Sequence, residues 1–212
     1  MTVFIYTGPA DSRIHLLLTH GASEAVDSPF LTAFAESLSG RGVRVARFEF
    51  EYLAQRRHGG SKRPPPRTPV LEEELRQILS GYAHSGPVFI GGKSMGGRIA
   101  SMVAEEQFLA GRVAGAVCLG YPFHPPGKPE KLRTAHLEEI TAPVLICQGT
   151  RDPFGTREDV AGYKLSNAIE LQWLEDGEHS FKARKASGYT QEQHIEAAAE
   201  AAFSFMQEKM NA

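Results

Sequence analysis

Short apolar runs alternate along the chain with longer segments in which apolar residues recur at helical spacing. The short runs are rich in β-branched residues, as is typical of buried strands. They cover residues 3–6, 14–20, 43–50, 87–92, 113–120, 143–149 and 168–174. This alternation predicts an α/β fold, with a mostly parallel central sheet of about seven strands and helices on both faces. Residues 7–13 contain Gly-Pro and Asp-Ser pairs that favour a turn, so we expect the first two strands to pair as a hairpin.

The helical segments carry start signals of their own. Ser28-Pro29 and Thr68-Pro69 each place an N-cap residue before a proline that suits the first helical position. A third helix is expected over residues 95–109, and a capping box at 190–193 predicts the start of the terminal helix. The expected buried positions are Phe30, Phe34, Leu38, Leu71, Leu75, Ile78, Leu79, Ile195, Ala199, Ala202 and Met206.

Two segments, 51–68 and 121–138, match neither pattern and are rich in proline, glycine and charge. Each follows the carboxyl end of a predicted strand. Open α/β sheets build their binding sites at this edge. We therefore expect both segments to form walls of a pocket.

The stretch IGGKSMGG at residues 90–97 can be interpreted in two ways. A phosphate-binding loop, G-x-x-x-x-G-K-[ST], would need its first glycine where the chain has Pro87. A nucleophile elbow needs G-x-S-x-G between a strand and a helix, with small residues two positions either side of the serine. Gly92 and Gly96 meet this need around Ser94. The pattern indicates an elbow that presents Ser94 as a nucleophile.

A serine nucleophile needs a base and an orienting carboxylate, which in this arrangement follow in the order Ser, Asp, His after later strands. Asp152 follows the strand that ends at residue 149, and His179 follows the last strand. The order and spacing predict a triad of Ser94, Asp152 and His179. Its oxyanion hole would use the backbone N–H groups of Met95, directly after the nucleophile, and Ala22, in the loop after the second strand.

These motifs resemble a known family. THGAS, GGKSMGGRIAS, GTRDPFG and GEHSF together are similar to the α/β-hydrolase superfamily, over nearly the whole chain. The closest likeness is to a small dienelactone-hydrolase-like subgroup with FEFEY and RPPP segments, related to a scaffold subunit of a histone acetyltransferase complex. The resemblance implies an α/β-hydrolase fold, the same triad, and no metal or organic cofactor. The chain departs from the family pattern in one respect, since it has no inserted lid domain; we therefore expect a shallow pocket of low selectivity.

Composition narrows the functional class. With 212 residues the chain is expected to form a single α/β-hydrolase domain over residues 1–212. A net charge of −2 does not favour nucleic acid or an anionic membrane as a partner. Cys118 and Cys147 lie in apolar runs, and we see neither a signal peptide nor a membrane-spanning run. We therefore expect a cytoplasmic protein with free thiols, and an edge strand or the terminal helix could pair two copies.

Several other residues have both a functional and a structural interpretation. His20 is expected to bond backbone near the oxyanion loop rather than act as a base, and Asp159 and Asp176 are weaker alternatives for the triad carboxylate. Lys93 is expected to form an ion pair with Glu49 or Glu51.

The basic, proline-rich loop at 55–67 could attract an anionic substrate or simply be solvated; its basic residues are Arg56, Arg57, Lys62, Arg63 and Arg67. The aromatic residues expected to line the pocket are Tyr121, Phe123 and Phe154.

The sequence thus predicts a serine hydrolase that acts on small carboxylic esters or thioesters through an acyl-enzyme. The alternative is a catalytically silent interaction module that keeps the hydrolase fold. An acyltransferase or a peptidase with the same triad also stays open.

Overall fold

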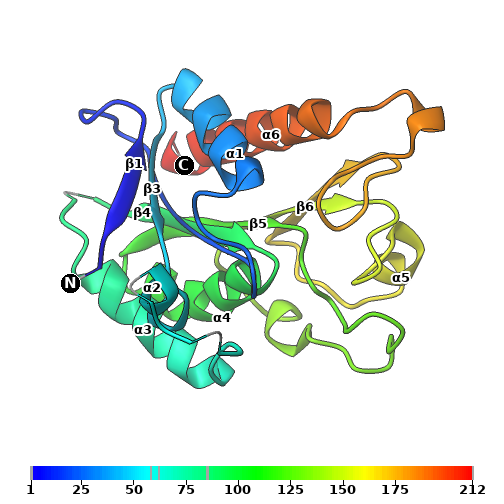
Figure 1. Cartoon of the computed structure of the whole chain (residues 1–212), viewed down its shortest axis with the longest axis horizontal. Coiled ribbons are helices and arrows are strands. Elements are labelled where there is room, and N and C mark those ends of the chain that lie inside the picture. The colour runs from blue at the N-terminus through cyan, green and yellow to red at the C-terminus, as the bar shows by residue number, and fades with distance from the viewer. Residues whose placement is uncertain (1, 58, 62, 85, 212) are drawn as a thin grey trace.

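A single sheet of seven strands organises the molecule (Figure 1). The computed structural model describes residues 2–57, 59–61, 63–84 and 86–211. The strands are β1 (Phe4–Thr7), β2 (His15–Thr19), β3 (Arg44–Phe48), β4 (Val88–Lys93), β5 (Val113–Leu119), β6 (Val144–Gly149) and β7 (Ile169–Leu174). Their order across the sheet is β1-β3-β2-β4-β5-β6-β7, and only the pairing of β1 with β3 is antiparallel. The predicted α/β fold is confirmed.

Helices cover both faces of this sheet. They are α1 (Pro29–Gly40), α2 (Glu51–Arg57), α3 (Thr68–Ser80), α4 (Met95–Leu109), α5 (Arg157–Ala161) and α6 (Gln191–Asn211), with short 3₁₀ turns η1 (Ala135–Leu137) and η2 (Lys185–Ser187). Helices α1 and α6 lie on one side of the sheet and α3 and α4 on the other (Figure 1). Within the described ranges no lid domain is inserted between the strands, as expected. No helix among the described residues is long and apolar enough to span a bilayer.

The predicted hairpin between the first two strands is wrong. Strand β1 pairs with β3, with Phe4 opposite Phe48, whereas β2 lies between β3 and β4 and is parallel to both. Every residue of β2 is buried, while β1 is only partly buried. Both edges of β2 are occupied by parallel partners, so the shorter β1 takes the outer edge of β3. There Arg44 lies 4.5 Å from the centre of the Tyr6 ring and secures the pairing.

The helix starts follow the sequence signals with one exception. The Ser28 hydroxyl caps α1 by accepting from the Leu31 N–H at 3.4 Å. At the start of α6, Thr190 Oγ1 accepts from the Gln193 N–H at 3.2 Å, and Gln193 Oε1 accepts from the Thr190 N–H at 2.9 Å, which completes the expected capping box. The exception is α3, where Thr68 is the first helical residue and not the N-cap. Its hydroxyl accepts from an arginine of α4 instead.

The core is divided by the sheet into two clusters. One packs beneath α3 and α4, and the other packs beneath α1 and α6. All the positions that the helical patterns marked as buried belong to these clusters. Cys118 and Cys147 are buried free thiols, and burial raises the pKa of both, that of Cys147 to about 12. They are therefore unreactive packing residues.

Truncation of Phe34 tests the packing of α1 on the sheet. This side chain is 0% exposed, so Phe34→Ala should leave a cavity and lower the free energy of unfolding by about 3–5 kcal/mol. Denaturant unfolding of the variant beside Ala33→Ser, an exposed position on the same helix, measures the effect. The control should stay within about 0.5 kcal/mol of wild type. A loss below about 1 kcal/mol for Phe34→Ala would show that α1 does not depend on this contact.

Candidate active site

A strained turn presents Ser94 between β4 and α4. Its backbone angles are φ 51° and ψ −114°, which are uncommon for a residue with a side chain. The chain passes so close to itself here that only glycine fits. A Cβ on Gly92 would lie 2.6 Å from the carbonyl carbon of Gly96, and a Cβ on Gly96 would lie 2.6 Å from the carbonyl oxygen of His20. The expected strand–turn–helix elbow is therefore present.

The three residues predicted to act together lie within hydrogen-bond distance in the structure. His179 Nε2 lies 2.8 Å from Ser94 Oγ, and His179 Nδ1 lies 2.8 Å from Asp152 Oδ2. They come from the loops that follow β4, β6 and β7, and thus from the carboxyl edge of the sheet. The His179 side chain is 18% exposed, whereas that of Asp152 is fully buried. The imidazole therefore bridges a buried carboxylate and a hydroxyl.

Further donors fix the carboxylate of Asp152. Its Oδ1 accepts from the Phe154 N–H at 2.9 Å, and its Oδ2 accepts from Gln148 Nε2 at 3.0 Å. Gln148 is itself held, because its Oε1 accepts from the Tyr121 N–H at 2.6 Å. The sequence analysis did not single out Gln148. The available signal is an uncharged polar residue inside a fully buried strand, four positions before the candidate carboxylate.

The alternative carboxylates have other partners. Asp176 pairs with Arg184 and with Arg151, whose Nε lies 2.9 Å from its carboxylate. Asp159 caps α5 by accepting from the Thr156 N–H at 3.0 Å. Neither carboxylate contacts the imidazole of the candidate triad.

The loop after β2 lies beside the nucleophile. A Cβ on Gly21 would be 3.8 Å from the Ser94 Cβ, so Ala22, the next residue, lies close to the elbow. The carbonyl oxygen of Ala22 accepts from the Tyr52 hydroxyl at 2.8 Å, which anchors this loop to α2. Met95 begins α4, where the first N–H groups of a helix have no partner within the helix. Both residues predicted to supply the oxyanion donors thus belong to segments next to Ser94.

His20 has the structural role that the sequence predicted. It is fully buried; its Nε2 accepts from the Phe50 N–H at 3.1 Å, and its Nδ1 lies 2.6 Å from the Gly21 carbonyl oxygen. These contacts require a neutral ring protonated at Nδ1. Burial also lowers the pKa of His20. The histidine ties the β2 loop to the chain that follows β3.

The prediction for Lys93 is wrong. Its side chain is buried and forms no ion pair with Glu49 or Glu51; instead Nζ donates to the carbonyl oxygen of His179 at 2.5 Å. Glu49 is paired with Arg57, which explains why it is not available. Burial lowers the pKa of Lys93 to about 8, although Asp152 opposes this shift. A buried lysine next to the nucleophile therefore holds the backbone of the catalytic histidine candidate.

The aromatic side chains expected to line the pocket divide into two groups. Phe154 lies against the site, with its ring centre 4.2 Å from that of His179. Tyr121 and Phe123 are 0% exposed and belong to the core beneath α4, so they do not line an open pocket. Their bulk is enclosed because the segment after β5 folds back onto the sheet.

The basic residues of the loop at 55–67 have mixed roles. Arg57 pairs with Glu49 and Asp27, and Arg56 donates to the backbone carbonyl of Arg63. Lys62 lies outside the described residues. These contacts fold part of the basic cluster against the protein.

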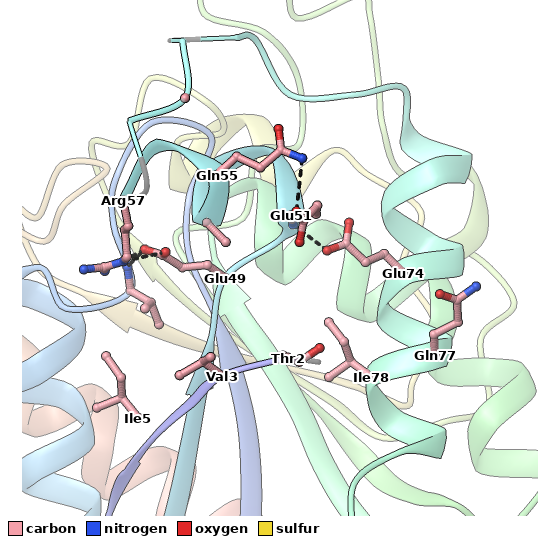
Figure 2. Close-up of a pocket in the computed structure, with 13 residues that line it drawn as sticks. Thr2, Val3, Ile5, Glu49, Glu51, Gln55, Arg57, Glu74, Gln77 and Ile78 are labelled. Carbon is pink, nitrogen blue, oxygen red and sulfur yellow. Dashed lines mark hydrogen bonds and ion pairs between the residues drawn. The ribbon is translucent and has the colours of Figure 1, made fainter.

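A cavity of about 1060 Å³ lies at a different place, between α2, α3 and the β1 edge (Figure 2). Figure 2 shows Arg57 turned to Glu49, and Glu51 beside Glu74, along its upper wall. None of the residues that line it belongs to the group around Ser94. This cavity is therefore not the place where the hydroxyl, imidazole and carboxylate meet.

This fold and elbow define an α/β-hydrolase, and comparison with known proteins agrees. The profile of the alpha/beta hydrolase domain family matches residues 12–207. The chain belongs to this family.

Solved structures with the same fold include several hydrolases. Est1E from Butyrivibrio proteoclasticus is 14% identical, with a TM-score of 0.71 and coverage of 100% of this chain and 99% of Est1E. The monoacylglycerol lipase of Paleococcus ferrophilus is 16% identical, with a TM-score of 0.70 and coverage of 97% and 99%. The dienelactone hydrolase of Anabaena variabilis is 20% identical, with a TM-score of 0.70 and coverage of 96% and 89%. At these identities the likeness establishes the fold.

The buried Lys93 should leave a signature in the pH dependence of stability. Its pKa is lowered from 10.5 in the unfolded chain to about 8 in the folded protein, so between these values the unfolded state binds more protons. Stability should therefore rise with pH across that window, relative to Lys93→Met, by at most about 1.4 kcal/mol per pH unit.

Denaturant unfolding of both proteins between the two pKa values measures this difference. Lys182→Met, which removes an exposed lysine near the same loop, should keep the wild-type dependence. If the free energy of unfolding of wild type and of Lys93→Met changed equally with pH in this window, the pKa of Lys93 would not be lowered by folding.

Proposed function

We propose that the protein is a serine hydrolase that cleaves small carboxylic esters or thioesters through a covalent acyl-enzyme. Ser94 is the nucleophile, His179 the general base and acid, and Asp152 the carboxylate that orients the imidazole. The N–H groups of Met95 and Ala22 form the oxyanion hole. The observation that carries the proposal is the pair of 2.8 Å contacts that link Ser94 Oγ, His179 and Asp152.

The first half of the reaction forms the acyl-enzyme. Ser94 Oγ attacks the acyl carbon while His179 Nε2 accepts its proton, and the carbonyl oxygen becomes an oxyanion held by the two N–H groups. The carboxylate of Asp152 stabilises the imidazolium through its contact with Nδ1. The tetrahedral intermediate then collapses, and His179 gives its proton to the departing alcohol or thiol.

The second half releases the acid. A water molecule replaces the leaving group, and His179 takes one of its protons as the water attacks the acyl carbon. A second tetrahedral intermediate expels Ser94 Oγ, which recovers the proton from His179. The enzyme returns to its starting state with the carboxylic acid free.

Two further observations support an ester or thioester as the substrate. The structural neighbours include an enzyme named a monoacylglycerol lipase and one named a dienelactone hydrolase, whose names denote ester cleavage. The strain at Ser94 also favours a nucleophile over a simple helix cap, because the Ser94 side chain makes no capping hydrogen bond. A silent interaction module, the alternative suggested by the resemblance to a scaffold subunit, has no need of this strain.

Labelling with a fluorophosphonate probe tests the nucleophile. Wild type should be labelled, whereas Ser94→Ala and His179→Ala should not be, because the probe reacts with a serine activated by its base. Ser80→Ala is a matched control, since Ser80 is an exposed serine at the end of α3, away from the elbow. An unlabelled but folded wild-type protein would favour the interaction module. If wild type is labelled, product analysis with water, amine and alcohol acceptors separates a hydrolase from an acyltransferase.

Substitution of the orienting carboxylate gives a graded test. Asp152→Asn keeps the shape of the side chain but removes its charge and favours the wrong imidazole tautomer. The value of kcat for a 4-nitrophenyl ester should fall by a factor on the order of 10³–10⁴. Asp159→Asn, which changes a carboxylate outside the candidate triad, should retain activity. A loss of less than tenfold in Asp152→Asn would remove this residue from the proposed triad.

A further inference from the structure

Helix α4 is the meeting point of the two segments expected to form pocket walls. Arg98 Nη1 donates to Thr68 Oγ1 at 3.4 Å, at the end of the segment 51–68. Ser101 Oγ lies 2.9 Å from Nε2 of His136, which belongs to the segment 121–138. Arg98 and Ser101 are three residues apart and thus share one face of the helix. Both walls therefore close on the same face of α4, immediately after the nucleophile.

Positive charge gathers at this junction without a carboxylate. Neither Arg98 nor Arg133 forms an ion pair with any described residue. Arg133 lies at this junction, because the Tyr121 hydroxyl donates to the Arg133 carbonyl oxygen at 3.1 Å and lies 3.4 Å from Nε2 of His136. Burial and then the charge of Arg98 lower the pKa of Arg133. Burial, again followed by Arg98, lowers the pKa of His136 to about 4. At neutral pH the junction thus holds two unneutralised guanidinium groups beside a neutral imidazole.

The hydrogen-bonding capacity of these arginines is largely unused. Arg98 Nε is buried and has no hydrogen-bond partner in the structure, and a buried donor left in this state costs stability. The Arg133 side chain donates no hydrogen bond to any described residue. An anion placed between Arg98 and Arg133 would neutralise the charge and satisfy the free donors.

The junction lies next to the proposed chemistry. The Arg98 N–H donates to the Ser94 carbonyl oxygen at 3.0 Å, so Arg98 lies one helical turn, about 5.4 Å along the axis, from the nucleophile. The positive end of the α4 dipole favours negative charge at this place as well. A ligand held at the junction would extend over the elbow.

Building on the serine hydrolase function proposed above, we propose that Arg98 and Arg133 bind an anionic group, a carboxylate or a phosphate, of the ester or thioester substrate. The substrate class is then an acyl compound that carries a negative charge on either its acyl chain or its leaving group. The pair supplies a planar, fork-shaped set of donors that suits both anions.

Matched substrate pairs test the proposal and locate the charge. The 4-nitrophenyl monoester of adipate is compared with 4-nitrophenyl hexanoate, which differs at the end of the acyl chain. Acetyl-coenzyme A is compared with S-acetyl-N-acetylcysteamine, which lacks the phosphates of the leaving group. In one of these pairs the charged member should have a kcat/KM about tenfold higher, mainly through KM, and the ratio should fall as salt screens the charge.

Arginine variants show whether the junction causes this preference. In Arg98→Gln and Arg133→Gln the ratio within the responsive pair should fall towards one. Arg13→Gln is the matched control, since Arg13 is an exposed arginine before β2, at the opposite edge of the sheet, and it should keep the wild-type ratio. If Arg98→Gln does not fold, Arg133→Gln carries the test. Equal use of charged and neutral members by wild type, or a preference that survives in both variants, would overturn the proposal.

A binding measurement separates this proposal from the proposed function. Calorimetric titration of Ser94→Ala with monomethyl adipate and with coenzyme A needs no turnover. Saturable binding of either ligand to Ser94→Ala, lost when Arg98→Gln is added to it, supports the anion site. This conclusion holds even if the fluorophosphonate probe labels no serine in the wild-type protein. If wild type is labelled and active but prefers neither charged substrate, and Ser94→Ala binds neither ligand, the proposed function is supported and the anion site is overturned.

Discussion

The close approach between the β4–α4 turn and the end of β2 is the constraint on which the site depends. The backbone of Gly96 lies so near the His20 carbonyl oxygen that a side chain there would collide with it. This contact allows Ser94 to take its left-handed conformation and to project from the sheet edge. It also brings the loop that contains Ala22 to the same place. One steric condition thus positions both the candidate nucleophile and the loop that holds one candidate oxyanion donor.

The histidine loop is held from several directions. Lys93 donates to the His179 carbonyl oxygen, and His194 Nδ1 lies 2.8 Å from the Phe181 carbonyl oxygen. Asp176, whose own φ is 58°, accepts from the Arg184 N–H at 2.7 Å across the same loop. Phe181 in this loop also has a positive φ of 66°, a backbone conformation that is costly for a residue with a side chain. These buried contacts fix the imidazole close enough to Ser94 for a hydrogen bond.

Two regions with different proposed roles meet at α4. At its N-terminus, Ser94 faces the imidazole and carboxylate from the loops after β6 and β7. On its flank, Arg98 lies between the two irregular segments, with charge that no described carboxylate neutralises. The helix thereby links the reacting group to the region proposed to recognise an anion. The first turn of α4 contributes to both of these regions.

The sequence by itself determined the α/β class, a mostly parallel sheet of about seven strands, the elbow, and the three residues that lie within hydrogen-bond distance of one another there. These follow from local patterns, since strand and helix periodicity, glycine spacing and the order Ser, Asp, His can be read along the chain. Only the tertiary structure decided that β1 pairs with β3, that Lys93 binds a carbonyl oxygen, and that Tyr121 is enclosed in the core. Each of these depends on which distant segment occupies a given space. Local periodicity carries no information about which distant segment packs at a given place. That choice depends on how much apolar surface each arrangement buries once the whole chain has folded.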